Sequence, residues 1–259
     1  TYNKKSSPLA KEEGVDIVVY EFTNKGLKVE EPKLTKKGDL YSGSFTIDSN
    51  TNAVLFGISY KEVKDNNGKT GYVVPVYNAK KIIVPGYFAA ANTICTGYGE
   101  YLTGMTNNKE KAWTILENGL KADPSLINDI SFMNAYLAGI STNKKEEAAT
   151  LIPIELVQFE KKGKLTEADY SFLSYWYGRQ KNKEKADAIT AAMKAAYPNG
   201  NWVQTEAAAN INKEKDPAKK QALINDYIAK YPTTKETQGR VDNFKTQLAS
   251  SYAAANDYT

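Results

Sequence analysis

The hydrophobic pattern changes its period near residue 86, and this change constrains the fold more than any single motif. Before it, apolar and polar residues alternate in short runs separated by turns rich in Asn, Gly and Lys. After it, alanine and leucine become frequent and apolar residues recur every three or four positions. Alternation is typical of a β-strand, and the longer period is typical of an amphipathic helix. The sequence therefore predicts an α+β protein with a strand domain at 1–86 and a helical domain at 87–259.

The first domain is predicted to be an antiparallel, immunoglobulin-like β-sandwich. Short strands that follow one another without an intervening helical pattern are typical of such sandwiches. The first run is apolar enough to be covered on both faces of a sheet. Asn67-Gly68 favours the positive φ angles of a tight hairpin, which we expect to precede the last strand. The expected strands are 15–22, 27–34, 40–47, 53–60 and 71–77.

The second domain repeats itself at intervals of a helical hairpin. A motif of Asn-Lys, charged residues and Ala occurs three times, at 108–112, 143–148 and 182–186. Its alanines are 36 and 38 residues apart. Periods of this length are typical of repeats made of two helices. We expect about four such pairs joined by short Asn/Lys turns, with a last helix at 235–257.

One unit matches a tetratricopeptide repeat in more detail. Such a repeat places an aromatic residue, a leucine, a small residue, a tyrosine and an alanine at positions that here hold Tyr170, Leu173, Ser174, Tyr177 and Ala186. Small residues allow two helices to approach closely, and aromatic side chains fill the groove beside them. The unit that ends at Pro232 has Lys220 in place of the alanine. The sequence therefore predicts tetratricopeptide-like pairs rather than a strict array.

The chain has no histidine and one cysteine, Cys95. Histidine is the usual general base near neutral pH and a common metal ligand, and a dithiol redox site requires two cysteines. Ser-His-Asp and Cys-His catalysis, His-based metal sites and Cys-x-x-Cys chemistry are excluded within these residues. We expect no catalytic, cofactor-binding or metal-binding residue, and we expect Cys95 to be a buried residue on a helix. An enzyme that uses carboxylates alone is a further alternative.

Charge and hydropathy limit the classes of partner that this chain is expected to bind. Thirty-four basic residues against thirty acidic ones give a net charge of +4, with the two signs interspersed. Nucleic-acid-binding proteins usually carry a denser basic surface, so we expect no nucleic acid partner. No apolar run approaches the roughly 18 residues that span a bilayer. Because the chain begins at Thr1 rather than Met, there is room for a signal peptide or a lipid anchor ahead of it.

Three glycines suggest a nucleotide-binding turn, but their spacing is wrong. Gly97 and Gly99 would require the third glycine at position 102, which is Leu102, and the next glycine is Gly104. No strand-helix-strand unit is predicted around them. We interpret these glycines as sites of close packing in the first helix, or as a break in it.

The densest aromatic cluster provides the candidate partner-binding residues, which are Tyr175, Trp176 and Tyr177. Three consecutive helical residues point in three directions, so at least one of them is expected to leave the core. Such a side chain is a candidate aromatic anchor on the concave face of the repeats. Packing between helices is the alternative. The other two tryptophans, Trp113 and Trp202, are expected in the core.

The N-terminal part also holds short segments found in a known type of protein. They are Tyr2, Asn3 and Lys4, then Ser7, Pro8, Leu9 and Ala10, the strand at 15–20, Leu40, Tyr41, Ser42, Gly43, Ser44 and Phe45, and finally Gly71 and Tyr72. With them the chain resembles the N-terminal region of bacterial thioredoxin-like envelope proteins of the TlpA or redoxin type. In these proteins a β-sandwich and a helical-repeat segment precede a C-terminal thioredoxin domain.

The resemblance implies export to the periplasm or cell surface and a role linked to thiol-disulfide exchange. Because Cys-x-x-Cys is missing, the chain would be either a fragment that ends before the thioredoxin domain or a redox-silent relative. It implies a non-catalytic accessory region whose repeats present a surface to a protein partner or to the adjoining thioredoxin domain. The alternative is a glycan-binding β-sandwich module, which the 18 tyrosines favour because sugars stack on exposed aromatic rings.

Overall fold

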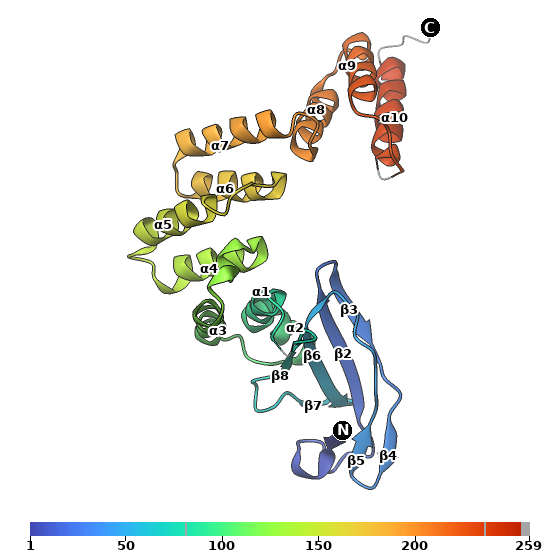
Figure 1. Cartoon of the computed structure of the whole chain (residues 1–259). Helices are drawn as coiled ribbons and strands as arrows, with labels where there is room; N and C mark the ends of the chain where they lie inside the picture. Colours follow the sequence, from blue (N-terminus) through green and yellow to red (C-terminus); the bar gives the residue numbers. More distant parts are fainter. Residues whose placement is uncertain (81, 236, 255–259) are drawn as a thin grey trace. The chain divides into compact units, whose positions relative to one another are not determined.

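The structure is a computed structural model that describes residues 1–80, 82–235 and 237–254 (Figure 1). Strands occupy the first part of the chain and helices follow, so the predicted α+β order is confirmed. Two compact units are present, Thr1–Lys161 and Lys162–Thr259. Within the described residues, no helix combines the length and the hydropathy that a membrane span requires.

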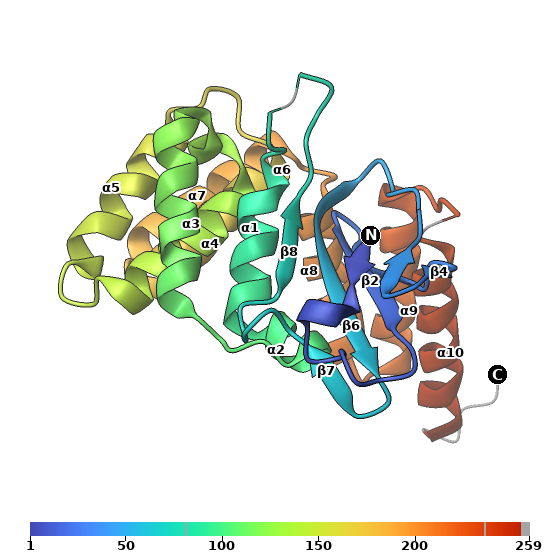
Figure 2. The ribbon, with the colours of Figure 1, turned by 90° about the horizontal axis from the view of Figure 1, so that it is seen from below.

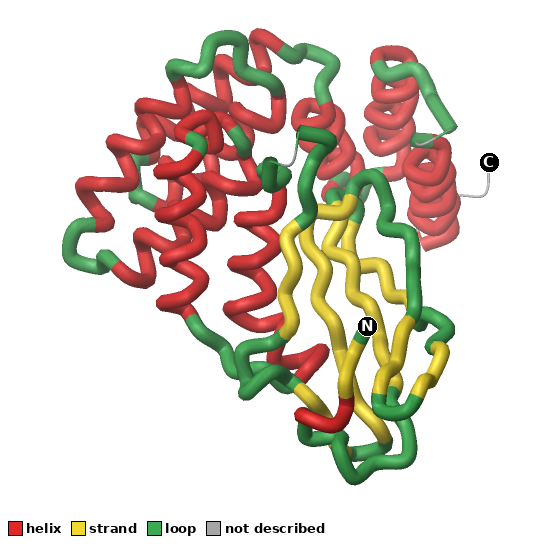
Figure 3. The backbone as a smooth tube through the Cα atoms, turned by 60° about the horizontal axis from the view of Figure 1, so that its bottom comes forward, coloured by secondary structure: helices red, strands yellow, loops and turns green. Residues whose placement is uncertain are grey.

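The strands are short, apart from the two that form the centre of the larger sheet. They are β1 (Tyr2–Asn3), β2 (Asp16–Thr23), β3 (Gly26–Glu30), β4 (Thr35–Lys37), β5 (Leu40–Ser42), β6 (Thr51–Tyr60), β7 (Val63–Asp65) and β8 (Tyr72–Pro75). The larger sheet has the order β3-β2-β6-β7, and β8 also pairs with β6. The smaller sheet has the order β1-β5-β4. All of these pairs are antiparallel, as predicted, and the strands of the larger sheet run side by side in Figure 3.

Both faces of the larger sheet are covered, which the apolar first strand predicted. On β6, alternate side chains point to opposite faces. Ile58 packs in a cluster with Tyr41 of the smaller sheet and with Leu9. Leu55 points the other way, into a cluster with the first helices. The larger sheet is therefore the middle layer between a small sheet and a group of helices.

Asp65 ties the smaller sheet to the larger one. Its Oδ2 accepts hydrogen bonds from the hydroxyl of Tyr2 on β1, at 2.6 Å, and from that of Tyr72 on β8, at 3.0 Å. Burial and the hydrogen bond to this carboxylate raise the pKa of Tyr2, and the same two causes raise that of Tyr72 to about 12. Both phenols therefore stay protonated and keep donating to Asp65. Tyr2 and Tyr72 are among the residues of the resemblance described above.

The expectation of a tight hairpin at Asn67-Gly68 is wrong. β7 and β8 do not pair with each other, because both pair with the same edge of β6, at Ile58–Tyr60 and at Ala53–Phe56. The turn between them is long and contains positive φ angles at Asn67, Gly68, Lys69 and Gly71. The tight turn lies instead between β6 and β7, where Lys61 has a φ of 51°.

The helices begin after residue 85. They are α1 (Gly86–Thr93), a π-helical segment η2 (Ile94–Tyr98), α2 (Gly99–Thr103), α3 (Lys109–Ala122), α4 (Ile130–Asn143), α5 (Ala148–Glu160), α6 (Glu167–Arg179), α7 (Lys183–Ala196), α8 (Asn201–Lys213), α9 (Pro217–Lys230) and α10 (Gln238–Ala254). Short 3₁₀ segments are η1 (Lys4–Ser6) and η3 (Pro124–Asn128). The expected last helix at 235–257 corresponds to α10; residues 236 and 255–257 lie outside the described residues.

Helices close in sequence contact one another: α3 contacts α1 and α4, α4 also contacts α5, α6 contacts α7, and α9 contacts α8 and α10. The repeated Asn-Lys motif starts two of these helices, α3 and α7. Asn108 accepts a hydrogen bond from the backbone N–H of Lys111 at 2.8 Å, and Asn182 accepts one from Lys185 at 3.1 Å. An asparagine at this position satisfies an N–H group that the helix itself leaves unpaired. In these two copies the motif is therefore a helix start and not only a turn, whereas in the copy at 143–148 Asn143 is the last residue of α4.

The pair α6–α7 confirms the predicted close approach of small residues. The hydroxyl of Ser174 lies 2.8 Å from the hydroxyl of Thr190 and 3.3 Å from the carbonyl oxygen of Ala186. A longer side chain at Ser174 would separate the two helices, so these contacts require a small residue there.

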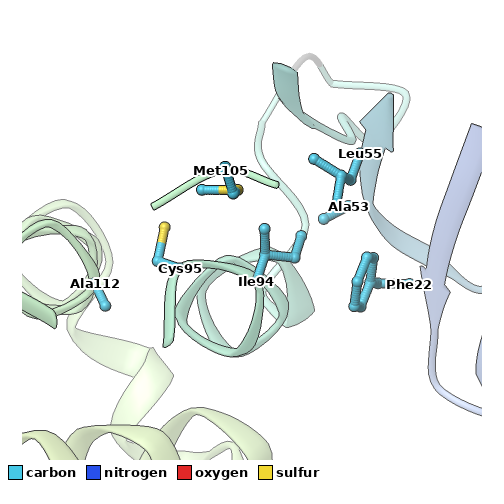
Figure 4. Packing of buried hydrophobic residues seen from close by; sticks show 7 residues of the cluster. All are labelled: Phe22, Ala53, Leu55, Ile94, Cys95, Met105 and Ala112. Atoms are coloured by element: carbon cyan, nitrogen blue, oxygen red, sulfur yellow. The ribbon is translucent and has the colours of Figure 1, made fainter. Parts of the chain in front are cut away.

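The first compact unit joins the sheet to the first helices. Figure 4 shows Phe22, Ala53 and Leu55 of the sheet packed toward Ile94, Cys95 and Met105, with Ala112 farther out. The helix α1 lies beside β6 and β8 in Figure 2. The last strand ends at Pro75 and the first α-helix begins at Gly86, close to the predicted boundary at residue 86. The compact unit nevertheless continues to Lys161, because the sheet buries one of its faces against these helices.

Glu21 on β2 is the most deeply buried acidic side chain among the described residues, with 0 % of its side chain exposed. Its carboxylate accepts hydrogen bonds from the Thr51 hydroxyl at 2.5 Å, from the Asp48 backbone N–H at 2.8 Å and from Lys28 at 3.4 Å. Burial raises the pKa of Glu21, but these bonds favour the ionised form more strongly, so that the pKa lies below 4.5. Glu21 thus holds the segment before β6 against β2.

Replacing Glu21 by Gln should lower the free energy of unfolding at pH 7 by about 1–3 kcal/mol, because the bonds to an ionised group are lost. A lowered folded-state pKa contributes stability above the unfolded value, and that stability disappears as the pH falls through the folded value. Urea unfolding from pH 7 down to pH 3 should therefore show a weaker acid dependence in Glu21→Gln than in the wild type. The exposed Glu62→Gln variant is the control. An identical acid dependence in Glu21→Gln and the wild type would contradict this role.

Candidate functional site

Chemically reactive groups are sparse in this structure. No group of three or more Cys, Asp or Glu residues in the described part of the chain is placed to hold a metal ion. Cys95 is buried on the π-helical segment with 1 % of its surface exposed, as predicted. Burial raises the pKa of its thiol, so it stays protonated and poorly nucleophilic at neutral pH. Of the nearby glycines, Gly99 is a site of close packing, because a Cβ there would lie 2.1 Å from Met105 Sδ. A Cβ on Gly97 would meet nothing within 4 Å, and Gly104 ends α2 in the left-handed conformation.

The three candidate residues on α6 divide between core and surface. Trp176 and Tyr177 are buried, with 2 % and 4 % exposed, whereas 55 % of Tyr175 is exposed. The expectation that at least one leaves the core is confirmed. Arg179, one turn later, donates a hydrogen bond to the Tyr175 hydroxyl at 3.1 Å, and its guanidinium lies 5.8 Å from the centre of the Tyr175 ring. The Tyr175 ring is therefore exposed and yet held in place by a cation–π contact.

Tyr175 belongs to a stripe of residues along one face of α6. Ala168, Ser171, Tyr175 and Arg179 follow at intervals of three and four residues, which places them on the same side of a helix. The residues buried in the core, such as Leu173 and Tyr177, lie on other sides of the helix. We call this stripe the α6 face. Its first half carries small side chains, and its second half carries the aromatic ring and the positive charge.

Trp202 was expected in the core, and this expectation is wrong. It lies in the first turn of α8 with 39 % of its surface exposed. Glu167 fixes this turn beside α6, because its carboxylate accepts the backbone N–H groups of Asn201 at 2.9 Å and of Trp202 at 2.5 Å. The carboxylate at a helix N-terminus also interacts favourably with the helix dipole. A Cβ on Gly200 would lie 2.7 Å from this carboxylate, so the close approach depends on the glycine.

Trp202 and the first half of the α6 face together line a pocket of about 330 Å³ in the second unit, and Tyr175 and Arg179 lie beyond it. Its other lining residues are Glu167, Ala168, Ser171, Asn201 and Thr205. The candidate site is therefore an open surface with two exposed aromatic rings, Tyr175 and Trp202, above small and hydroxyl-bearing side chains. It can hold another molecule by packing and hydrogen bonding.

The helical period contains the signal that would have placed Trp202 correctly. The core side of α8 is formed by Val203, Ala207, Ala208 and Ile211. At 100° per residue, Trp202 lies on the opposite side of the helix from these residues. A large aromatic residue on the polar side of a helix is a surface residue.

Comparison of the chain with protein-family models, with curated proteins and with solved structures found no significant match.

The three tryptophans should differ in their accessibility to a soluble quencher. Trp202 is exposed, whereas Trp113 and Trp176 are 9 % and 2 % exposed. Replacing Trp202 by Phe should therefore lower the acrylamide quenching constant of the remaining fluorescence and shift its emission to shorter wavelength. The Trp176→Phe variant is the matched control, and its quenching constant should rise above that of the wild type. Equal quenching of Trp202→Phe and the wild type would show that Trp202 is covered.

Proposed function

We propose that this chain is a non-catalytic protein-interaction region in which the α6 face and Trp202 bind a polypeptide partner. One observation carries the proposal: the exposed Trp202 lines a pocket with small residues of α6, and the exposed Tyr175 lies one turn beyond that pocket on the same face of α6. Aromatic residues and arginine are the side chains that most often dominate the energy of protein interfaces. In the core these two side chains would be inaccessible to a partner. Exposed to water alone, they would contribute no binding or folding energy.

The dimensions of the α6 face suit a short stretch of extended peptide. From Ala168 to Arg179 a helix rises by roughly 16 Å, at 1.5 Å per residue. An extended chain covers that distance with about five residues. Side chains of the partner would pack between Trp202 and Tyr175, above Ala168 and Ser171. Arg179 at the far end favours a carboxylate or a carbonyl group of the partner.

The class of protein to which this region belongs is inferred from the sequence. We propose that the chain is an accessory region of an exported, thioredoxin-like envelope protein, with an immunoglobulin-like sandwich and tetratricopeptide-like helix pairs. The order of sheets and helix pairs supports this reading, as do the close α6–α7 contact at Ser174 and the structural roles of Tyr2 and Tyr72. The partner would be another envelope protein or an adjoining thioredoxin domain, and the α6 face would be its contact surface.

A photo-cross-linking experiment tests the surface directly. A benzoylphenylalanine placed at position 175 should cross-link to a polypeptide in an envelope fraction of the cells that produce the protein. That polypeptide, or the adjoining domain, is then purified and its affinity is measured by titration calorimetry. The double variant Tyr175→Ala/Trp202→Ala should bind at least about tenfold more weakly than the wild type, because it removes both aromatic anchors.

Tyr101→Ala is the matched control, because it removes an even more exposed tyrosine, 85 % exposed, from α2 in the other unit. It should leave the affinity unchanged. Thermal unfolding of each variant checks that the fold is retained. Unchanged affinity of the double variant for the purified partner would refute the assignment of this surface, as would the absence of any cross-linked polypeptide.

A further inference from the structure

A larger groove, of about 650 Å³, lies in the first unit. It is formed where the turn between β2 and β3 and the segment before β6 meet α1 and the π-helical segment. This volume lies within the range of about 300–1,000 Å³ found for small-molecule sites. The residues that line this groove all belong to the first unit, and none of them is part of the α6 face.

The lining of this groove combines apolar side chains with polar groups that carry almost no charge. Amide side chains come from Asn24, Asn50 and Asn52, and hydroxyl groups come from serine and threonine residues. Among the described residues that line it, none is a lysine or an arginine. Asp129 is the one carboxylate among these described residues, and it already accepts the backbone N–H of Phe132 at 2.7 Å at the start of α4. The described lining therefore offers hydrogen bonds but no counter-charge for an anionic ligand.

Two of the amides form a pair that keeps bonding capacity for a ligand. Asn52 donates a hydrogen bond to Asn24 at 2.7 Å. A primary amide has two donor hydrogens and one carbonyl acceptor, so one bond between two amides leaves both donor and acceptor groups free on the pair. The position of Asn52 depends on Gly86 at the start of α1, where a Cβ would lie 2.2 Å from Asn52 Oδ1. Because Gly86 has no side chain, the pair can lie directly against the start of α1.

An aromatic ring forms one wall of the groove. Tyr98 is 50 % exposed and packs edge-to-face on the buried Phe22, with ring centres 6.0 Å apart and planes at 77°. This contact fixes the orientation of the ring while half of its surface stays open. Ala89 and Ala90 of α1 also line the groove with small side chains. A flat apolar ring, small residues and paired amides therefore surround the same open volume.

We propose that this groove binds a neutral oligosaccharide. Sugar rings carry apolar C–H faces that pack on an aromatic ring, and neighbouring hydroxyls that both donate and accept hydrogen bonds. Tyr98 supplies the first kind of contact, and Asn24, Asn50 and Asn52 supply the second. An anionic ligand would leave its charge unpaired in this groove, and a lipid would leave the amides without partners. This function is independent of the partner binding proposed for the α6 face.

Titration calorimetry with cellohexaose, xylohexaose, mannohexaose and chitohexaose tests the proposal on the full chain. At least one of these neutral probes should bind, and Tyr98→Ala should weaken its binding by about tenfold or more. Tyr98→Phe keeps the ring and should retain most of the affinity. Asn50→Ala, which removes an amide of the lining, should also weaken the binding.

Tyr101→Ala is the control on the neighbouring helix, because Tyr101 is exposed but does not line the groove. Thermal unfolding shows whether each variant is folded. The proposal is overturned if none of the four probes binds, or if Tyr98→Ala and Asn50→Ala, both folded, bind as tightly as the wild type. It is also overturned if only a charged probe, hexagalacturonate, or an unstructured hexapeptide binds.

Discussion

The packing of the larger sheet on the first helices is the contact on which the rest of the first unit depends. Met105 is central to it, because Gly71 and Gly99 leave room for its sulfur from two sides. A Cβ at either glycine would lie within 2.7 Å of that atom, so no other residue fits without a shift. Leu55 and Ile94 complete the same cluster. Burial of these apolar side chains stabilises the contact and makes the sheet and the helices one compact unit.

Both proposed sites depend on this kind of fixed framework, although they are built differently. Tyr98 is oriented by its contact with the core residue Phe22, and Trp202 is oriented by the bond of Glu167 to its backbone. In the first case a buried ring holds the exposed ring itself, and in the second a hydrogen bond holds the backbone that carries it. Rings that are fixed before binding lose little conformational entropy when a ligand arrives. The second unit offers a shallow face for a polypeptide, and the first offers a polar groove for a smaller ligand.

Local patterns predicted much of this fold and less of its sites. The burial of Cys95 and the exposure of one of the three residues 175–177 follow from residue type and period alone. Asn108 and Asn182 were expected in turns, and the structure shows that they start helices. The pairing of β7 and β8 with one edge of β6 does not, because a turn motif specifies local φ angles and not the strand that a segment pairs with. The exposure of Trp202 follows from its position on the polar side of α8, which the size of its side chain does not indicate.

The sequence by itself determined the α+β order, the helical second part of the chain and the absence of histidine chemistry, since these depend on composition and on neighbours along the chain. Tertiary structure alone decided which side chains share a surface. Asn24, Asn52 and Tyr98 are far apart in sequence and meet only because the sheet packs on α1. Glu167 and Trp202 likewise meet through a bond between two helices. Contacts of this kind depend on how elements pack, and no periodicity within a single element encodes them.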